Sequence, residues 1–187
     1  MGASDGFILP LQAQYVKEAI ASGRSAKKIG WIGAPAHYPP SRAVAEVVPD
    51  AEQHFFDPIA ANSLNTHKFD ANSEGWGADL AEQGFDMLTL FRVTCHIVDM
   101  QGLINEIRGF LNSDHRTVLF EDFQGDKKPD NDTIVYRLGD TQYVAHNRPI
   151  LWGEERLLDN FNVTLHTKFF NAHTNITSMY YTLTRKA

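Results

Sequence analysis

Polar side chains that can move a proton or bind a charge follow a long apolar run in the middle of the chain. Met87 to Val93 is almost entirely apolar or β-branched and lacks the alternation of a half-exposed strand, which predicts a strand covered on both faces. Arg92 and His96 come at its end. Histidine titrates near neutral pH and can act as a general base, and Arg92 can bind an acidic group or pair with a carboxylate. The alternative for His96 is a structural role, in which it joins strand and helix through hydrogen bonds.

A second group of candidates follows two earlier predicted strands. Gly33-Ala34-Pro35 ends one short apolar run, where glycine lets a backbone approach a ligand closely and the next helix start favours polar or anionic groups. Asp57 ends the following strand, roughly two dozen residues after Gly33, and its carboxylate can accept two hydrogen bonds from a vicinal diol. The alternatives are plain turns at both places, with Asp57-Pro58 starting the second.

Other candidates belong to the side of a substrate. Glu121-Asp122 ends a further predicted strand, and His37, Tyr38 and Trp152 are aromatic groups that can cover a planar substrate or a cation. Phosphate loops of the Gly-x-x-x-x-Gly-Lys type, His-Glu-x-x-His, Cys-x-x-Cys and Gly-x-Ser-x-Gly do not occur in the sequence. The histidines are scattered, so no metal site is predicted.

The elements that must position these groups alternate along the chain. Apolar periodicity, caps and turn residues predict helices at 10–23, 41–48, 78–83, 99–111 and 153–160, with Pro10, Ser41 and Asp99 at three of the helix starts. Strands are predicted at 28–34, 53–57, 66–70, 87–93, 116–123, 163–170 and 178–184, and a hairpin at 133–136 with 142–145. Such alternation is typical of a parallel sheet with helices on both faces.

Size and charge limit the classes of protein to consider. The chain has 187 residues, enough for one domain with a full hydrophobic core, and no apolar run reaches the roughly 20 residues that cross a bilayer. The single cysteine and the absence of a signal-like start predict a reducing, cytoplasmic location. A net charge of −6 argues against a broad nucleic-acid footprint.

The segment from Phe85 to Leu111 resembles the fourth strand and following helix of class I S-adenosylmethionine-dependent methyltransferases. The family pattern ends in Arg-Val-Leu-His-His-Ile-x-Asp, and this chain has Arg92-Val93-Thr94-Cys95-His96-Ile97-Val98-Asp99. The family helix reads Leu-x-Glu-Ile-x-Arg-x-Leu, and here residues 104–111 take its place. The last two predicted strands resemble the antiparallel pair that closes the family's sheet.

The resemblance implies cofactor-binding positions. The family places an acidic residue before a Gly-x-Gly-x-Gly loop, whereas this chain has Trp31 at the acidic position and retains only Gly33 of the glycines. Some viral RNA-cap methyltransferases carry a similar Gly-x-Pro variant. Asp70-Ala71-Asn72 corresponds to the family's adenine contact, with turn formation as the alternative, and Phe91 and Arg92 correspond to the lining of the cofactor and substrate crevice.

The resulting prediction is a Rossmann-like α/β domain over residues 1–187, with an open sheet of about seven strands, mostly parallel with an antiparallel C-terminal strand. Residues 1–24 form a cap helix, and residues 124–152 form an inserted hairpin or loop.

The implied function is methyl transfer from S-adenosyl-L-methionine to a small molecule or an RNA cap guanine. The alternative is an inactive scaffold, favoured by Trp31. The predicted site residues are His96 and Arg92 as catalytic groups, Gly33, Ala34, Pro35, Asp57, Pro58, Asp70, Ala71, Phe91 and Arg92 for the cofactor, and Tyr38, Asp122 and Trp152 for the substrate. No membrane contact is expected, and no oligomeric state is indicated.

Overall fold

A computed structural model describes residues 5–58, 62–124, 133–138, 141–146, 154–171 and 176–187. Its sheet has seven strands in the order β3-β2-β1-β4-β5-β9-β8. The strands are β1 (Lys28–Ile32), β2 (Glu52–Asp57), β3 (Thr66–Lys68), β4 (Met87–Leu90), β5 (Thr117–Gln124), β8 (Phe161–Asn171) and β9 (Ile176–Arg185). The first five pair in parallel, and β9 runs antiparallel to both β5 and β8. The predicted open, mostly parallel sheet with a reversed last strand is confirmed.

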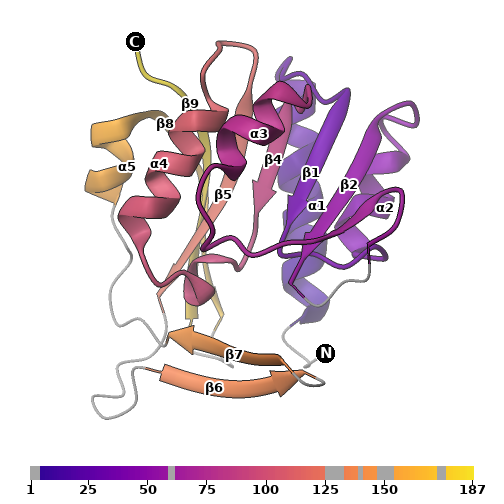
Figure 1. The fold of residues 1–187 in the computed structure, drawn as a ribbon. Coiled ribbons are helices and arrows are strands. Elements are labelled where there is room, and N and C mark those ends of the chain that lie inside the picture. The colour runs from indigo at the N-terminus through magenta and orange to yellow at the C-terminus, as the bar shows by residue number, and fades with distance from the viewer. Residues whose placement is uncertain (1–4, 59–61, 125–132, 139–140, 147–153, 172–175) are drawn as a thin grey trace.

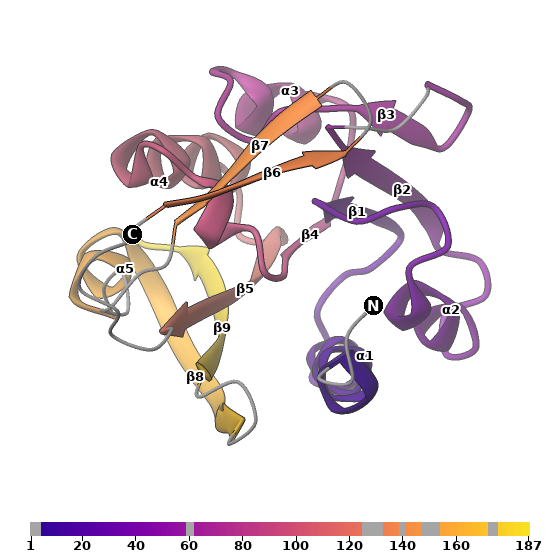
Figure 2. The same ribbon diagram turned by 90° about the horizontal axis from the view of Figure 1, so that it is seen from below.

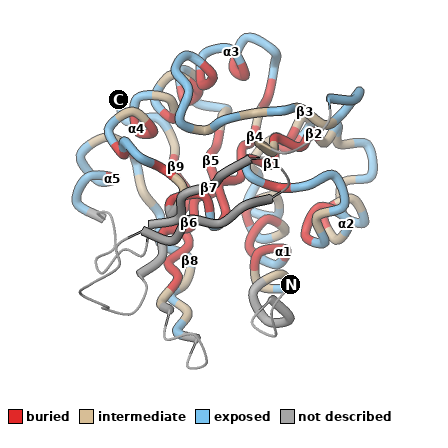
Figure 3. Tube along the Cα trace, turned by 60° about the horizontal axis from the view of Figure 1, so that its bottom comes forward, coloured by how far each residue is buried: buried red, intermediate tan, exposed pale blue. Residues whose placement is uncertain are grey.

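Helices cover both faces of this sheet, as Figures 1 and 2 show. On one face lie α1 (Asp5–Ala21) and α2 (Pro39–Ala45), and on the other α3 (Trp76–Glu82), α4 (Met100–Phe110) and α5 (Glu154–Asn160). The buried side chains form two clusters, one for each face, and Figure 3 marks the buried positions along the chain. Such a sandwich of layers buries apolar surface on both sides of the strands, which explains why β4 is buried at every position.

The layer of α3 and α4 packs without space to spare. A Cβ on Gly77 would lie 1.8 Å from the carbonyl oxygen of Glu106 in α4, so only glycine fits there. The Glu106 carboxylate accepts hydrogen bonds of 2.7 Å from the backbone N–H groups of both Gly75 and Gly77. Glu106 thereby satisfies free donors at the start of α3 and fixes the register of the two helices.

The segment that resembles the methyltransferase family folds largely as predicted. Asp99 is the N-cap of α4, since its Oδ1 accepts from the N–H of Gln101 at 2.9 Å. The apolar face of the helix is buried, at Leu103, Ile104 and Ile107 among others. The strand, however, ends at Leu90 rather than Val93, because Arg92 adopts a left-handed backbone (φ 58°) and Thr94–His96 form a short 3₁₀ helix, η1.

Two predicted helix starts are wrong. The first helix begins at Asp5, with Pro10 inside it, because a proline this close to the start removes only one intrahelical donor. The second begins at Pro39, whose ring is already suited to the first helical position. Ser41 therefore lies inside the helix, and its hydroxyl donates to the Tyr38 carbonyl at 2.8 Å instead of capping.

The predicted insertion after β5 contains a hairpin of β6 (Thr133–Leu138) and β7 (Thr141–His146), paired antiparallel. It is separate from the main sheet. The hairpin lies across the carboxyl end of the parallel strands in both ribbon views, and β7 contacts η1. The insertion therefore sits at the edge where the candidate residues gather. In the part of the chain that the model describes, no helix is long and apolar enough to cross a bilayer.

Candidate functional site

The strand order brings most of the predicted site residues to one edge of the sheet. Because β3, β2, β1, β4 and β5 are adjacent and parallel, the segments after them lie side by side at their carboxyl ends. This edge is where open α/β sheets bind ligands. It collects the loop at Gly33–Pro35, Asp57-Pro58, Asp70-Ala71 and the turn at Phe91-Arg92. Trp152 lies outside the described residues.

The glycine loop is held by its neighbours. The N–H of Gly33 donates to the carbonyl of Phe56 at 2.6 Å, and the carbonyl of Pro35 accepts from the N–H of Tyr38 at 2.9 Å. Gly33 has a left-handed backbone (φ 74°), and a Cβ there would lie 2.9 Å from Cγ2 of Val93. Glycine is needed at this position both for the turn and for the close approach of the loop after β4.

Trp31 takes the position of the family's acidic residue and is part of the hydrophobic core. Trp31 is completely buried, its Nε1 donates to Oε1 of Gln53 at 2.9 Å, and its ring meets Tyr38 edge to face at 5.8 Å. Trp31 thus packs against the α2 layer and presents no carboxylate to the edge. A ligand with an amino group would have to find another acceptor.

The acidic candidates on β2 and β3 stand at the ends of neighbouring strands. Asp57 is half-buried, its carbonyl accepts from the N–H of Phe69 at 3.2 Å, and Pro58 after it is also half-buried. Asp70 is exposed, and its Oδ1 accepts from the N–H of Asn72 at 2.9 Å, the turn formation considered as its alternative role. A turn does not exclude a ligand contact, since a carboxylate has two oxygens with several acceptor sites.

Asn72 belongs to the segment that the sequence placed at the adenine contact, although only its neighbours Asp70 and Ala71 were predicted as site residues. Its Nδ2 donates to the carbonyl of His96 at 3.0 Å, and its Oδ1 accepts from the N–H of Val98 at 2.8 Å. Asn72 therefore joins the loop after β3, with Ala71, to the turn that carries His96. The only signal for it in the sequence is its place beside Asp70.

The candidates on β4 and after it differ in accessibility. Arg92 is exposed and His96 half-exposed, so both can meet a ligand at this edge. Phe91 is buried against Tyr15 and Tyr180, with ring centroids 5.9 and 6.0 Å apart, and the Ala34 side chain is buried in the same cluster. Only the backbone of Phe91 and Ala34 is left to contact a ligand.

The two acidic residues of β5 point to opposite faces. Glu121 is level with Tyr180 of β9 and packs toward α1, whereas Asp122 is level with Met179 and belongs to the α4 side. Both are buried. Glu121 is hydrogen-bonded by Gln12 and Tyr180, so it supports the edge from behind. Burial raises the pKa of the Glu121 carboxyl, and the nearby Arg92 cation and the hydrogen bonds it accepts oppose that rise.

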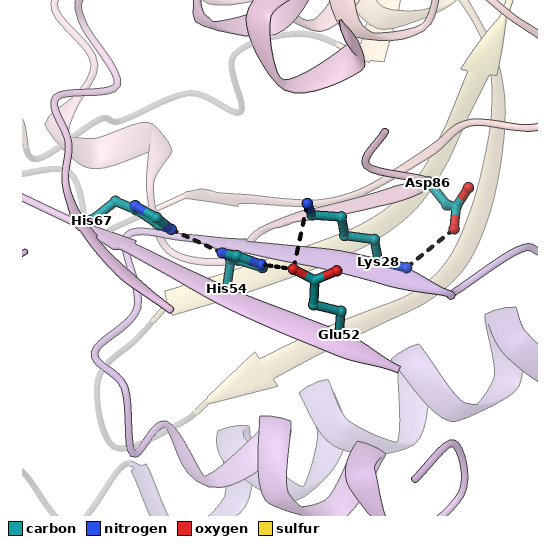
Figure 4. A network of polar contacts seen from close by, with 5 residues as sticks. All are labelled: Lys28, Glu52, His54, His67 and Asp86. Atoms are coloured by element: carbon teal, nitrogen blue, oxygen red, sulfur yellow. Dashed lines mark hydrogen bonds and ion pairs between the residues drawn. The ribbon is translucent and has the colours of Figure 1, made fainter. Parts of the chain in front are cut away.

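A separate network of polar contacts runs across β3, β2 and β1 and ends at Asp86 (Figure 4). His54 Nδ1 and His67 Nε2 are 2.9 Å apart, the other His54 nitrogen contacts Glu52, and Lys28 Nζ lies 3.4 Å from the same Glu52 oxygen. At the other end, Asp86 accepts from the N–H of Lys28 at 3.1 Å. Within the described residues, no group of three or more His, Cys, Asp or Glu side chains is placed to hold a metal ion.

Solved structures share this fold, although no protein-family model and no curated protein matches the sequence. One is the 1,6-didemethyltoxoflavin-N1-methyltransferase of Burkholderia thailandensis, solved with 1,6-didemethyltoxoflavin and S-adenosylhomocysteine bound. The TM-score is 0.59 at 12% identity, over 98% of this chain and 80% of that chain. Another is DhpI in complex with S-adenosylhomocysteine (SAH), with a TM-score of 0.51 at 12% identity, over 97% of this chain and 89% of that chain.

These matches and the strand order define the class of fold. The seven-stranded sheet with a reversed β9 and helices on both faces is a Rossmann-like methyltransferase fold. At 12% identity the likeness is one of fold. The activity has to be argued from the residues at the edge.

Proposed function

We propose that this chain is a methyltransferase that uses S-adenosyl-L-methionine and methylates a small molecule. The observation that carries the proposal is the meeting of a left-handed glycine turn, two carboxylates and the Phe91-Arg92 turn at one edge of the sheet. The two structural neighbours are solved with S-adenosylhomocysteine bound, the product form of this cofactor, which supports the choice of ligand.

The residues present fit the nucleoside part of the cofactor. The Asp57 carboxylate can accept two hydrogen bonds from the ribose hydroxyls, and Asp70 can accept from the exocyclic amine of adenine. The Gly33–Pro35 backbone allows close approach, and Pro58, Ala71 and the Phe91 backbone complete the lining. The methionine part fits less well, because Trp31 offers no carboxylate to its amino group.

Bound S-adenosylmethionine supplies a methyl group on a positively charged sulfur, which is already a strong electrophile. The chain then has to position the acceptor and manage its proton. Positioning supplies much of the rate in such reactions, and His96 would take a proton from the acceptor. Arg92 would bind an acidic group of the substrate, and Tyr38 and Asp122 would belong to the substrate side. These roles are part of the proposal.

A small acceptor is favoured over an RNA cap. The net charge of −6 gives no general attraction to a phosphate backbone. The methyltransferase neighbour holds a small molecule, 1,6-didemethyltoxoflavin, beside S-adenosylhomocysteine.

Calorimetric titration of the wild-type chain with S-adenosylmethionine and with SAH tests the proposal. We expect saturable binding of both, and Asp57→Ala should weaken it by about 1–3 kcal/mol because charged hydrogen bonds to the ribose are lost. Asp114→Ala is the matched control, since this exposed aspartate lies before β5, at the opposite edge. Transfer of a labelled methyl group to a panel of small acceptors and to capped RNA then distinguishes the substrate classes.

Absence of binding at millimolar ligand would end the enzyme proposal and leave a scaffold with a methyltransferase fold. Equal binding by wild type and Asp57→Ala would mean that the ribose lies elsewhere. Methylation of capped RNA alone would overturn the choice of a small acceptor.

A further inference from the structure

A buried carboxyl group lies behind the candidate site without reaching it. Glu121 has no exposed surface, and its side chain accepts hydrogen bonds from Gln12 Nε2 at 2.9 Å and from the Tyr180 hydroxyl at 3.1 Å. The Ser178 hydroxyl is a further hydrogen-bond partner. Burying a carboxyl group costs free energy that such hydrogen bonds only partly offset. The buried Glu121 carboxyl is therefore expected to hold other groups in place.

The hydrogen bonds continue from Glu121 to the glycine loop. Gln12 is also fully buried, and its Oε1 accepts from the Tyr38 hydroxyl. The two ends of the Gln12 amide therefore have different partners, which fixes the direction of the amide. Tyr38 in turn donates its backbone N–H to Pro35, the last residue of the loop. The side chains of Gln12 and Tyr38 thus connect Glu121 of β5 with the loop after β1.

The groups that face Glu121 come from three parts of the chain. They are Gln12 from α1, Arg92 from the turn after β4, and Ser178 and Tyr180 from β9, with Tyr38 one bond further away. Burial and the neighbouring carboxyl raise the pKa of Tyr180, so its hydroxyl stays a donor. The Gln12 amide and the Tyr180 hydroxyl both donate to the Glu121 carboxyl, and the Tyr38 hydroxyl donates to Gln12.

We infer that Gln12 and Glu121 are positioning residues for the Gly33–Pro35 loop, which they hold through the Tyr38 hydroxyl so that α1 and the loop bind a cofactor as one unit. Neither residue touches the ligand, because both are fully buried. The inference rests on the proposed cofactor site and adds that α1 takes part in it. In this proposal, helix α1 covers one face of the sheet and also positions the Gly33–Pro35 loop.

The test breaks the link at two points and compares the effects. Gln12→Met removes the amide at similar length, and Tyr38→Phe removes only the hydroxyl and keeps the ring against Trp31. We expect each variant to weaken SAH binding about three- to tenfold, as loss of a positioning hydrogen bond would. The double variant should bind no more weakly than the weaker single variant, because both changes cut the same connection. Isothermal titration calorimetry measures all four affinities.

Tyr181→Phe is the matched control. Its hydroxyl donates to Met179 Sδ at 3.3 Å on the other face of β9, and the residue is as buried as Tyr180. Its SAH affinity should stay within about twofold of wild type. If Gln12→Met and Tyr38→Phe bind as the control does, the inference is overturned. Multiplying effects in the double variant would also overturn it, because the two residues would then act independently.

Unfolding measurements keep this test separate from the proposed function. If wild type binds neither SAH nor S-adenosylmethionine, the proposed function fails and the link is judged from the denaturation midpoints of the same four proteins. Midpoint shifts that do not add support a physical connection between α1 and the loop. Additive shifts in the ligand-free protein would refute the connection whatever the ligand result.

Discussion

The two faces of the sheet are packed by different chemistry. On the α3 and α4 side, apolar side chains and a glycine contact bring the helices together, and a Cβ at Gly77 would lie 1.8 Å from the Glu106 carbonyl oxygen. On the α1 side, buried hydrogen bonds cross the layer, from Gln12 to Glu121 and from Tyr15 to Thr182. Both faces contain fully buried side chains, so the two faces differ in the kind of contact that holds them.

The different packing of the two faces gives them different roles, one mainly in stability and the other in ligand binding. Apolar packing supplies free energy without demanding directions, whereas each buried polar group is stable only when its partner is in place. The hydrogen bonds of the α1 side reach the glycine loop through Tyr38. We therefore expect changes on the α4 side to act mainly on unfolding, and changes on the α1 side to act on ligand binding and on its pH dependence.

The largest expected effect is that of Gly77→Ala on the α4 side. The new methyl group meets backbone atoms of Glu106, which cannot rotate away, so the free energy of unfolding should fall by about 3 kcal/mol or more. Urea denaturation followed by circular dichroism measures it. Gly102→Ala is the control, since its nearest neighbour is the side-chain carboxylate of Asp99 at 3.1 Å, and it should change stability by less than about 1 kcal/mol. Equal effects of both changes would contradict close packing of α3 on α4.

A smaller loss is expected from Glu106→Ala, which removes the two hydrogen bonds to the start of α3. Loss of a cap costs about 1–2 kcal/mol. The control is Glu82→Ala, because Glu82 is exposed and lies in α3 itself. This change should leave the urea denaturation midpoint almost unaltered. A Glu106→Ala protein as stable as the control would show that α3 is held by apolar contacts alone.

On the α1 side, Glu121→Gln should change the pH dependence of stability. Burial raises the pKa of Glu121, so the fold favours the protonated form. The stability from this preference is fully present below the ordinary pKa and is lost as pH rises through the raised value. Because the amide stays neutral, the variant should gain on wild type as pH rises, by about 1 kcal/mol or more at pH 8.

Thermal unfolding between pH 4 and pH 9 measures this difference, with Glu82→Gln as an exposed control. A Tm difference between variant and wild type that stays level with pH would mean that Glu121 does not titrate with a raised pKa. A difference that falls as pH rises would mean that the carboxylate is favoured by its partners.

The smallest effect concerns His67, at the β3 edge of the α3 and α4 face. Burial lowers the pKa of His67, and so do His54 and Lys28. The neutral ring is therefore favoured, and its contribution is present above the ordinary pKa and is lost as pH falls through the lowered value. His67→Gln should lose about 1–2 °C less in Tm than wild type between pH 7.5 and pH 5. The exposed His115→Gln should follow wild type, and a His67→Gln curve that also follows it would count against the imidazole pair.

The sequence predicted the apolar packing of the α3 and α4 side, but not the buried hydrogen bonds of the α1 side. Periodicity predicted α4 with its Asp99 cap, the buried β4 and the presence of seven strands along the chain, because spacing of apolar residues is a local signal. Errors fell at turns. The strand β4 was predicted three residues too long, since a left-handed backbone at Arg92 has no signature when the residue is not glycine.

For the candidate site, sequence spacing predicted which residues reach the edge but not what lies behind them. Gly33 and Asp57 follow strands that pairing makes neighbours, as expected. The contact between Gln12 and Glu121 spans 109 positions in the chain and depends on how α1 crosses the sheet. A glutamine on the otherwise apolar face of the first helix, between Leu11 and Tyr15, is the signal that was there to notice.

The reversed strand β9 also has a consequence for synthesis. It lies between β5 and β8, although it is the last of the seven strands in chain order. A ribosome therefore releases β5 well before the strand that covers its open edge, and β8 emerges without a neighbour to pair with. An uncovered edge of this kind is prone to pair with other chains. We expect the nascent chain to depend on chaperones until Arg185 has left the exit tunnel, so that folding completes only after translation of the final strand.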